Sequence, residues 1–337
     1  MTRNRVTVWL VFLCLSCSGE PGEDPTDNLV PSGISELENA TLFENPVPPA
    51  TAELPAGVSG DDISDVAQLP TYSDWQPLRD CPVGTIALVG SESCEPMDSG
   101  CAEDSWPQPV EGESPTFFVE AGATGDGTDA TTPMGSIQAA LDQAEVGNVI
   151  YVASGTYEEV LTLTRAITLR GACTAETILL GSAPENLVKD AVINISGVGE
   201  VAVHSFTLTG ERNGLQVADH QGSIHLEALA IESNLYSGLH GQGNSAEVTF
   251  KRSSIRHTRP PDVGFGGFAV QLSSFIQVSF IDVEIRDNIQ FGLRMSAEAQ
   301  ATLERVAILD TQPNLESHPS APGIYGDAVY ITSYAQL

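Results

Sequence analysis

Short runs that alternate apolar and polar residues recur along the chain from Phe117 onward. Examples are "NVIYVASG", "AVINIS", "VAVHSFTLTG" and "FIQVSFIDVEIRD". Alternation with a period of two is typical of a β-strand with one buried face. One segment differs, because "SIQAALDQAEVG" has the period of a helix that Ser136 can cap and Gly147 can end. The apolar face of this helix is Ile137, Ala140, Leu141 and Ala144. The pattern predicts an all-β domain with one helix near its start.

The strands repeat at a nearly constant spacing. Aligned apolar residues are 23, 24, 30 and 23 positions apart, at Leu208, Ile231, Ile255, Ile285 and Ile308. A Gly-Leu pair follows at Gly214, Gly238 and Gly292, and looser versions are Gly267-Phe268 and Gly323-Ile324. Asn234 and Asn288 each stand three residues after an aligned position, where we expect left-handed corner conformations. A repeat of this length without helices indicates one coil of a parallel solenoid.

The alignment predicts which side chains stack between coils. The five aligned residues should form one inward ladder. A second should stand two residues earlier, at Phe206, Leu229, Ser253, Val283 and Val306. Facing outward, Asp282 should lie between Arg252 and Arg305, and Glu232 beside Arg256. We interpret these opposite charges as structural pairs across neighbouring strands.

Residues 117–173 also resemble a known family. The stretch contains Gly125-Asp126-Gly127-Thr128, then Pro133, the amphipathic helix and Gly155-Thr156-Tyr157-Glu158-Glu159. This order resembles the opening of right-handed parallel β-helix proteins of the pectin-lyase-like superfamily. The resemblance implies such a β-helix over 117–337, with the helix capping the stack, and it implies no particular activity. Together with the preceding Cys-rich segment, the chain is similar to uncharacterised exported bacterial β-helix lipoproteins.

The N-terminus has the parts of an export signal over 1–17. Arg3 and Arg5 precede the apolar run "VTVWLVFLCL", which is too short to span a bilayer. The following "CLSC" resembles the lipobox of bacterial lipoproteins, in which the last Cys is lipidated after cleavage. That resemblance implies lipidation of Cys17, although Cys14 stands where the family usually has Leu. Ordinary secretion is the alternative. We expect an exported protein of the cell envelope or outer surface, attached to the membrane by a lipid anchor only.

Residues 18–80 are strongly acidic. The whole chain has 45 Asp and Glu against 14 Lys and Arg, a formal net charge of −31. Such a charge excludes nucleic acid as a partner, because phosphate binding needs a basic face. The segment is also rich in Pro and poor in aromatic residues, so we interpret it as a disordered tether.

The remaining cysteines are Cys81, Cys94, Cys101 and Cys173. In an exported chain they predict disulfides, with three connectivities open. The preferred pairing is Cys81–Cys94, which leaves Cys101–Cys173 to staple a small Cys-rich segment (81–116) to the solenoid. A zinc site is disfavoured, because paired Cys-x-x-Cys spacing and a nearby His are missing.

Candidate chemistry is sparse. Arg256 and Arg259 lie in a basic loop, and Asp282 and Glu284 form an outward acidic pair, so these four residues are the candidate ligand-binding residues. A basic patch in a loop is the preferred interpretation of the two arginines, and the flanking Arg252 and Arg305 favour a structural role for the acidic pair over catalysis. Asp126 and Asp129 could hold Ca²⁺, the one cofactor considered, but a Gly turn is the preferred interpretation. No catalytic residue and no metal ligand is assigned.

The leading hypothesis is a surface-tethered, non-enzymatic β-helix protein that presents an extended face to a polysaccharide or a cell-surface protein. The alternative is a polysaccharide lyase or glycoside hydrolase whose site is incomplete in this chain, and a third is a degenerate product without function. The final strand is followed by no capping segment. We therefore expect a truncated C-terminus, with cover by a partner as the alternative.

Overall fold

The computed structural model describes residues 80–89, 91, 93–183, 190–243, 246–261, 266–312, 327–332 and 335–337. Cys17 and almost all of the predicted tether lie outside these residues, so the predictions made for them stay predictions. Within the described residues, no helix is long and apolar enough to cross a membrane.

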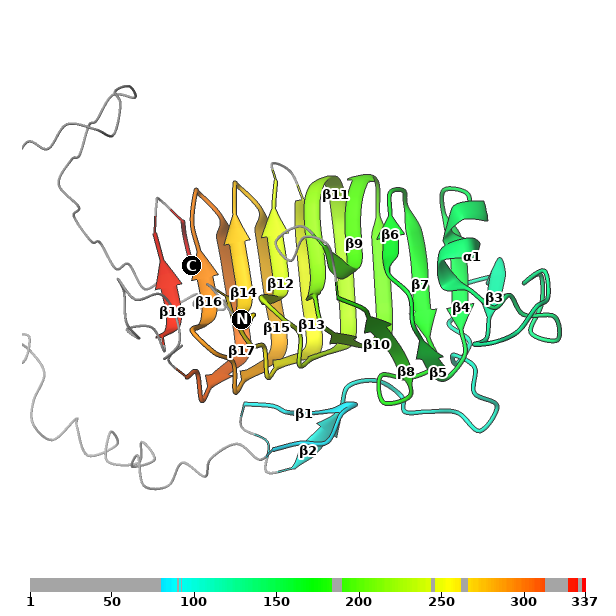
Figure 1. The fold of residues 1–337 in the computed structure, drawn as a ribbon, viewed down its shortest axis with the longest axis horizontal. Helices are drawn as coiled ribbons and strands as arrows, with labels where there is room; N and C mark the ends of the chain where they lie inside the picture. The colour runs from blue at the N-terminus through cyan, green and yellow to red at the C-terminus, as the bar shows by residue number, and fades with distance from the viewer. Residues whose placement is uncertain are drawn as a thin grey trace, which may run out of the picture. The chain divides into compact units, whose positions relative to one another are not determined.

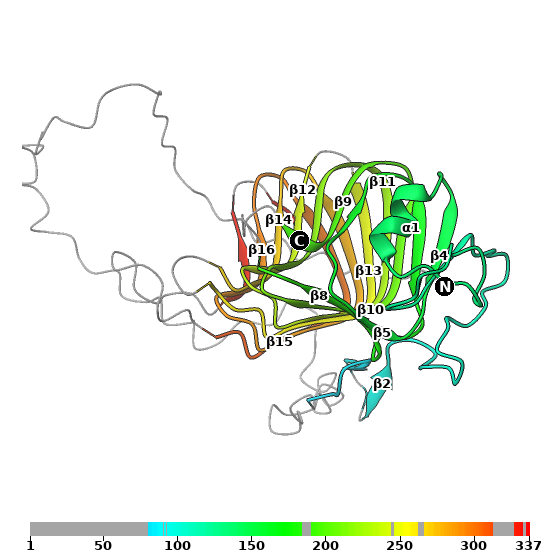
Figure 2. The same cartoon turned by 45° about the vertical axis from the view of Figure 1, so that its right-hand side comes forward.

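The described chain is a parallel β-helix, as the repeat predicted (Figures 1 and 2). Its strands pair with parallel neighbours throughout, and only the hairpin of β1 and β2 is antiparallel. The bounds are β1 (Thr85–Ala87), β2 (Cys94–Pro96), β3 (Phe117–Val119), α1 (Ile137–Gln143), β4 (Asn148–Val152), β5 (Gly155–Tyr157), β6 (Leu161–Leu163), β7 (Ile167–Gly171), β8 (Thr177–Gly181), β9 (Ala191–Val198), β10 (Val201–Gly210), β11 (Asn213–Glu232), β12 (Ser237–Gln242), β13 (Ala246–Arg256), β14 (Phe268–Ser273), β15 (Gln277–Arg286), β16 (Phe291–Met295), β17 (Gln300–Leu309) and β18 (Asp327–Ile331).

Each central coil passes through three faces. The first face holds β3, β4, β7 and the first halves of β10, β13, β15 and β17, together with Ile224–Glu227 of β11. The second face holds β5, β8 and the second halves of those long strands, with the end of β11. The third holds β6, β9, the start of β11, β12, β14, β16 and β18.

The long strands bend between the first and second faces at one left-handed residue each. These residues are Ser205, Ala228, Arg252, Asp282 and Arg305, with φ between 46° and 62°. The next corner uses Ser233, His257, Asp287 and Asp310 in the same conformation. The prediction that Asn234 and Asn288 take the left-handed positions is therefore wrong. Both are fully buried instead, and Asn288 Nδ2 donates to the carbonyls of Ile255 and Arg286.

The predicted inward ladder is confirmed by the strand register. Leu208 pairs with Ile231, Ile231 with Ile255, Ile255 with Ile285, and Ile285 with Ile308. The second ladder also holds, since Phe206 pairs with Leu229, and Val283 with both Ser253 and Val306. The apolar core therefore runs continuously along the inside of the coils, as the period required.

The Gly-Leu element corrects the alignment in two coils. Leu239 pairs with Val270, and Leu293 with Val329, so the equivalent pairs are Ala269-Val270 and Ala328-Val329. Gly267-Phe268 is out of register with the other copies, and Gly323-Ile324 lies outside the described residues. A Cβ added at Gly214, Gly238 or Gly292 would stand 2.4 Å from the Cγ2 of an isoleucine in the inward ladder. That contact explains why these coils carry glycine there.

Helix α1 stands beside the first coils, near the β3 and β4 end of the stack (Figure 1). Ser136 caps it by accepting from the backbone N–H of Ala139, as predicted. Glu159 accepts from the N–H groups of Ile137 and Gln138, at 3.0 Å each, and so satisfies two more helix donors. The helix ends at Gln143 with Ala144 as its C-cap, four residues before the predicted end at Gly147.

Candidate functional site

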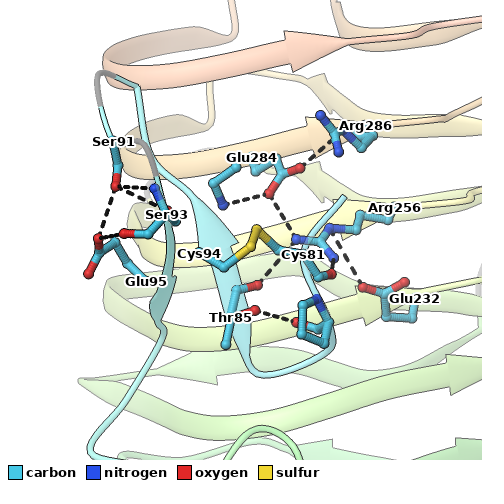
Figure 3. Close-up of a disulfide and its surroundings, with 12 residues drawn as sticks. Cys81, Thr85, Ser91, Ser93, Cys94, Glu95, Glu232, Arg256, Glu284 and Arg286 are labelled. Atoms are coloured by element: carbon cyan, nitrogen blue, oxygen red, sulfur yellow. Dashed lines mark hydrogen bonds and ion pairs between the residues drawn. A yellow bond between two sulfur atoms is a disulfide. The ribbon is translucent and has the colours of Figure 1, made fainter. Parts of the chain in front are cut away.

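Two of the candidate ligand-binding residues, Arg256 and Glu284, are buried together. Arg256 Nη2 lies 2.8 Å from Glu284 Oε2, and the two side chains are 2% and 0% exposed (Figure 3). Both project from the second face, as the alternation of their strands requires. Asp282 and Glu284 therefore do not form one acidic pair open to a ligand, because a second layer of chain covers Glu284.

That layer is the Cys-rich module, defined here as residues 81–98 with β1 and β2. Ala87 N–H donates to Glu284 Oε2 at 3.1 Å, and Arg256 donates to the carbonyl oxygens of Cys81 and Thr85. Ile86 and Met97 are buried against Ala228 and Ala230 of the β-helix. The Cys81–Cys94 disulfide closes the hairpin, which confirms the preferred pairing. The module is thus seated on the second face through buried polar and apolar contacts.

Charges of alternating sign continue on both sides of this pair. Glu232 Oε1 lies 4.0 Å from Arg256 Nε, and Arg286 Nε lies 3.2 Å from Glu284 Oε1. The predicted Glu232–Arg256 neighbours are therefore confirmed. Burial raises the pKa of Glu232, and the positive charge of Arg256 opposes this effect. Arg256 and Glu284 bind the module directly, and the covering layer closes this pair to a ligand.

Asp282 and Arg259 lie apart from this buried pair. Arg305 donates hydrogen bonds from Nε and Nη2 to the two carboxylate oxygens of Asp282, at 2.5 and 2.9 Å. These bonds hold the pKa of Asp282 below its ordinary value. Arg252 turns instead to the module, where it donates to the carbonyls of Pro96 and Met97. Arg259 is exposed, and its backbone forms a bridge with Leu235. The structure therefore does not bring the four candidate residues together into one site.

The Asp126 and Asp129 carboxylates close a turn. Asp126 Oδ1 accepts from Thr128 N at 3.1 Å and from Thr132 Oγ1 at 3.1 Å, while Asp129 Oδ1 accepts from Thr131 N at 2.7 Å. These hydrogen bonds hold the pKa of both carboxyl groups below the usual range. The geometry fits the turn interpretation and leads the chain into α1.

Over the described residues, one group of ligand atoms lies close enough together for a metal ion. It consists of Cys101, Cys173 and Glu176. The two sulfur atoms are joined in a disulfide, which is the second predicted bond. This bond staples the chain that follows the module to the β-helix, as expected.

A cavity of about 340 Å³ lies on the outer side of the first face, and sequence reasoning missed it. Arg170, His204 and Glu227 stand at equivalent positions on the adjacent strands β7, β10 and β11. Residues 97–110, which include the end of the module and the chain that follows it, form the opposite wall. The remaining lining residues are Met97, Asp98, Ser99, Pro107, Gln108, Pro109, Val110, Gly171, Ala172, Ser205, Ala228 and Arg252.

The charges of this cavity are balanced by local partners. Arg170 binds both carboxylate oxygens of Glu113, at 2.6 and 3.0 Å, and Lys251 Nζ lies 2.9 Å from Glu227 Oε1. His204 Nδ1 lies 3.8 Å from Glu227 Oε2. Burial, with Arg170 nearby, lowers the pKa of His204 to about 4. At neutral pH the imidazole is therefore uncharged and offers one donor and one acceptor nitrogen.

The wall opposite the strands is anchored at several points. Asp98 Oδ2 accepts from both the backbone N–H and the hydroxyl of Thr174, at 2.7 Å each. The bonds of Arg252 to Pro96 and Met97 hold one end of the wall, and the Cys101–Cys173 disulfide fixes the chain beyond Asp98. The cavity is thus preformed, which lowers the entropy cost of binding.

A sequence signal for one side of the cavity does exist. His204, Glu227 and Lys251 each stand four residues before an aligned ladder residue. Extending the alignment by four positions would have placed their side chains in one outward row. The covering segment 97–110 has no such periodicity, so its position could not be read from the pattern.

The comparisons with known proteins add only distant matches. No protein family model and no curated protein matches the chain. A pectin methylesterase mutant solved with a hexasaccharide has 10% sequence identity and a TM-score of 0.32, over 66% of this chain and 93% of that one. Pectin methylesterase PemA from Erwinia chrysanthemi has 12% identity and a TM-score of 0.32, with the same coverage. The β-helix assignment therefore rests on the strand register described above.

Proposed function

We propose that this chain is a non-enzymatic, surface-tethered binding protein whose first face recognises a glycan. The observation that carries the proposal is the preformed cavity beside Arg170, His204 and Glu227, whose charges are balanced. Concave sites with a few placed polar groups and apolar walls are the usual form of ligand sites. The strands of the first face continue beyond the cavity through β13, β15 and β17 and offer an extended surface for further units of a polymer.

The polar groups around the cavity favour binding over catalysis. A glycoside hydrolase needs two carboxyl groups at a defined separation, one of them ready to give a proton. The carboxylate of Asp98 accepts a hydrogen bond from Thr174, and that of Glu227 forms an ion pair with Lys251. Asp282 and Glu284 are committed to Arg305 and Arg256. These contacts support a structural role for the four carboxylates, which maintain the fold and shape the cavity, over a catalytic role.

The location is part of the same proposal. An export signal over 1–17, lipidation at Cys17 and an acidic tether over 18–80 would hold the β-helix away from the membrane that anchors it. An acidic chain repels itself and extends. The proposed binding face would then reach polymers outside the cell envelope.

A glycan array probed with the mature full chain tests the proposal. We expect hits with the wild-type chain that are lost with His204→Ala and retained with His257→Asn. A cell-surface protein captured through the same face, with no glycan hit, would contradict glycan recognition. Turnover of any hit polysaccharide, measured as new reducing ends or unsaturated products, would contradict the non-enzymatic part. A His257→Asn variant serves as the comparison, because His257 is exposed at the corner after the second face and does not line the cavity.

A further inference from the structure

The ligand-facing atoms of the cavity carry both hydrogen-bonding roles. Arg170 uses Nε and Nη2 for Glu113, and Arg252 uses Nε and Nη2 for backbone carbonyls of the module. The Nη1 groups of these two arginines have no hydrogen-bond partner among the described residues. Glu227 Oε2 and the neutral imidazole of His204 add acceptors, and Ser99 and Ser205 add hydroxyls. A ligand must therefore both donate and accept.

The charge balance excludes strongly charged ligands. Arg170 and Arg252 contribute positive charge to the lining, and Asp98 and Glu227 contribute negative charge. For an acidic ligand, repulsion by the two carboxylates would offset the attraction of the two arginines. For a basic ligand, repulsion by the arginines would offset the attraction of the carboxylates. A hydroxyl group donates and accepts at once and suits such a mixed lining.

The apolar part of the lining fits the carbon face of a sugar ring. Pro107 and Pro109 form one side, and Ala172 and Ala228 lie opposite on the β-helix. The volume of about 340 Å³ is near the lower end of the range of small-molecule sites, roughly 300–1,000 Å³. A site of this size would hold only part of a polymer and would leave the rest on the open face.

We propose that this cavity is a binding subsite for a neutral, polyhydroxylated sugar unit within a longer glycan, with His204 and Glu227 as its hydrogen-bonding residues. The inference rests on the proposed function and adds the charge class of the ligand and the residues that contact it. It also separates the site from the buried pair of Arg256 and Glu284, which the module covers.

Isothermal titration calorimetry of the mature full chain tests the subsite. The probes are neutral β-1,4- and α-1,4-linked glucose tetrasaccharides, an acidic galacturonate tetrasaccharide and a basic glucosamine tetrasaccharide. His204→Ala and Glu227→Gln alter the cavity. His257→Asn and Glu158→Gln are matched controls, because both side chains are exposed at the corner after the second face and do not line the cavity. Far-UV circular dichroism confirms that each variant is folded.

We expect a neutral tetrasaccharide to bind, with each cavity variant weakening it about tenfold, the effect of one lost hydrogen bond. The control variants should stay within about twofold. If a charged tetrasaccharide binds more tightly than the neutral ones and loses affinity with His204→Ala, the ligand is not neutral. Glycan recognition at this cavity would still hold. If a neutral tetrasaccharide binds both cavity variants as tightly as it binds the wild-type protein, the proposed subsite is wrong, although the proposed function is not. Failure of every probe, together with an empty glycan array, would overturn the inference and the proposed function together.

Discussion

Arg256 and Glu284 form an ion pair of 2.8 Å between neighbouring strands, and Glu284 also accepts the N–H of Ala87 from the module. One carboxylate oxygen therefore joins the β-helix to its covering layer. Burying an ion pair is costly and rarely raises stability over an apolar pair, but removing one partner leaves an uncompensated buried charge. The pair thus makes the seating of the module depend on both residues.

Glu284→Gln should destabilise the protein strongly. It removes the negative charge between Arg256 and Arg286 while keeping an oxygen for Ala87. We expect a loss of about 3–5 kcal/mol in the free energy of unfolding, measured by urea denaturation. Hydrogen exchange should also accelerate at the amide of Ala87. Glu304→Gln, whose side chain is 57% exposed, is the control and should change little. Unchanged stability and unchanged exchange at Ala87 would show that the pair does not seat the module.

The two disulfides should contribute unequally. Cys101–Cys173 closes a sequence separation of 72, against 13 for Cys81–Cys94. Loop entropy predicts losses of about 4 and about 3 kcal/mol when each is removed. Urea unfolding of the double variants Cys101→Ser/Cys173→Ser and Cys81→Ser/Cys94→Ser measures the difference. A larger loss for the shorter loop would mean that module packing outweighs loop entropy.

Removal of Cys101–Cys173 has a second expected effect. The wall over 97–110 would lose one of its anchors and keep the bonds of Asp98 and Arg252. Binding of the cavity ligand should therefore weaken in this variant and persist in the Cys81→Ser/Cys94→Ser variant. Equal weakening in both would indicate that the whole module, and not this staple, shapes the cavity.

The sequence predicted the inside of this fold better than its outside. The inward ladder from Leu208 to Ile308 follows from the period alone, because each coil must bury the same apolar position. Outward positions carry no comparable constraint. Glu284 and Asp282 look alike in the sequence, yet one is covered by the module and the other meets Arg305. The covering is decided by contacts between segments almost 200 residues apart, as in the bond from Ala87 to Glu284.

The corners were only partly predictable for a similar reason. Asn234 and Asn288 were expected to take left-handed conformations, but the preceding residues, Ser233 and Asp287, have them. A buried Asn can satisfy backbone groups across the stack, so its side chain, and not its backbone freedom, decides its place. The candidate site was missed because half of its lining comes from the aperiodic segment 97–110.

Gly238→Ala should destabilise the solenoid. The added Cβ would lie 2.4 Å from Ile255 Cγ2 and 2.7 Å from the carbonyl oxygen of Ala269. Overpacking of this kind costs about 1–3 kcal/mol. Thermal unfolding measures the loss. Gly292→Ala meets the same 2.4 Å contact, with Ile308, and should behave alike. Wild-type stability in both variants would show that the inward ladder can shift to admit a methyl group.

Cys17→Ser should release the protein from membranes if Cys17 carries the lipid anchor. Cys14→Ser would alter only the proposed signal and should therefore leave the protein membrane-bound. Fractionation followed by mass spectrometry of the mature N-terminus distinguishes the two. A mature chain that begins at an unmodified residue other than Cys17 would contradict the anchor and favour ordinary secretion.

The stability of the protein should fall on acidification partly because of His204. Its folded pKa of about 4 lies below the unfolded value near 6.5. Between these values the unfolded chain binds more protons than the folded one, so the free energy of unfolding decreases as the pH falls through this window. The full contribution is on the order of 3 kcal/mol and is present above pH 6.5. Burial lowers the pKa of His204 most, Arg170 and His225 lower it further, and the carboxylates of Glu227 and Glu113 oppose this effect.

Urea denaturation at pH 7 and pH 4.5 measures this dependence. His204→Asn cannot take up the proton, so the variant should lose part of the wild-type decrease between the two pH values. His257→Asn is the matched control, because His257 is exposed at another corner and Asn tolerates its left-handed conformation, with φ of 55°. The wild-type decrease should persist in this control. An identical decrease in the His204→Asn variant would mean that carboxylates alone set the acid sensitivity, and that the imidazole in the cavity is not held in its neutral form by the fold.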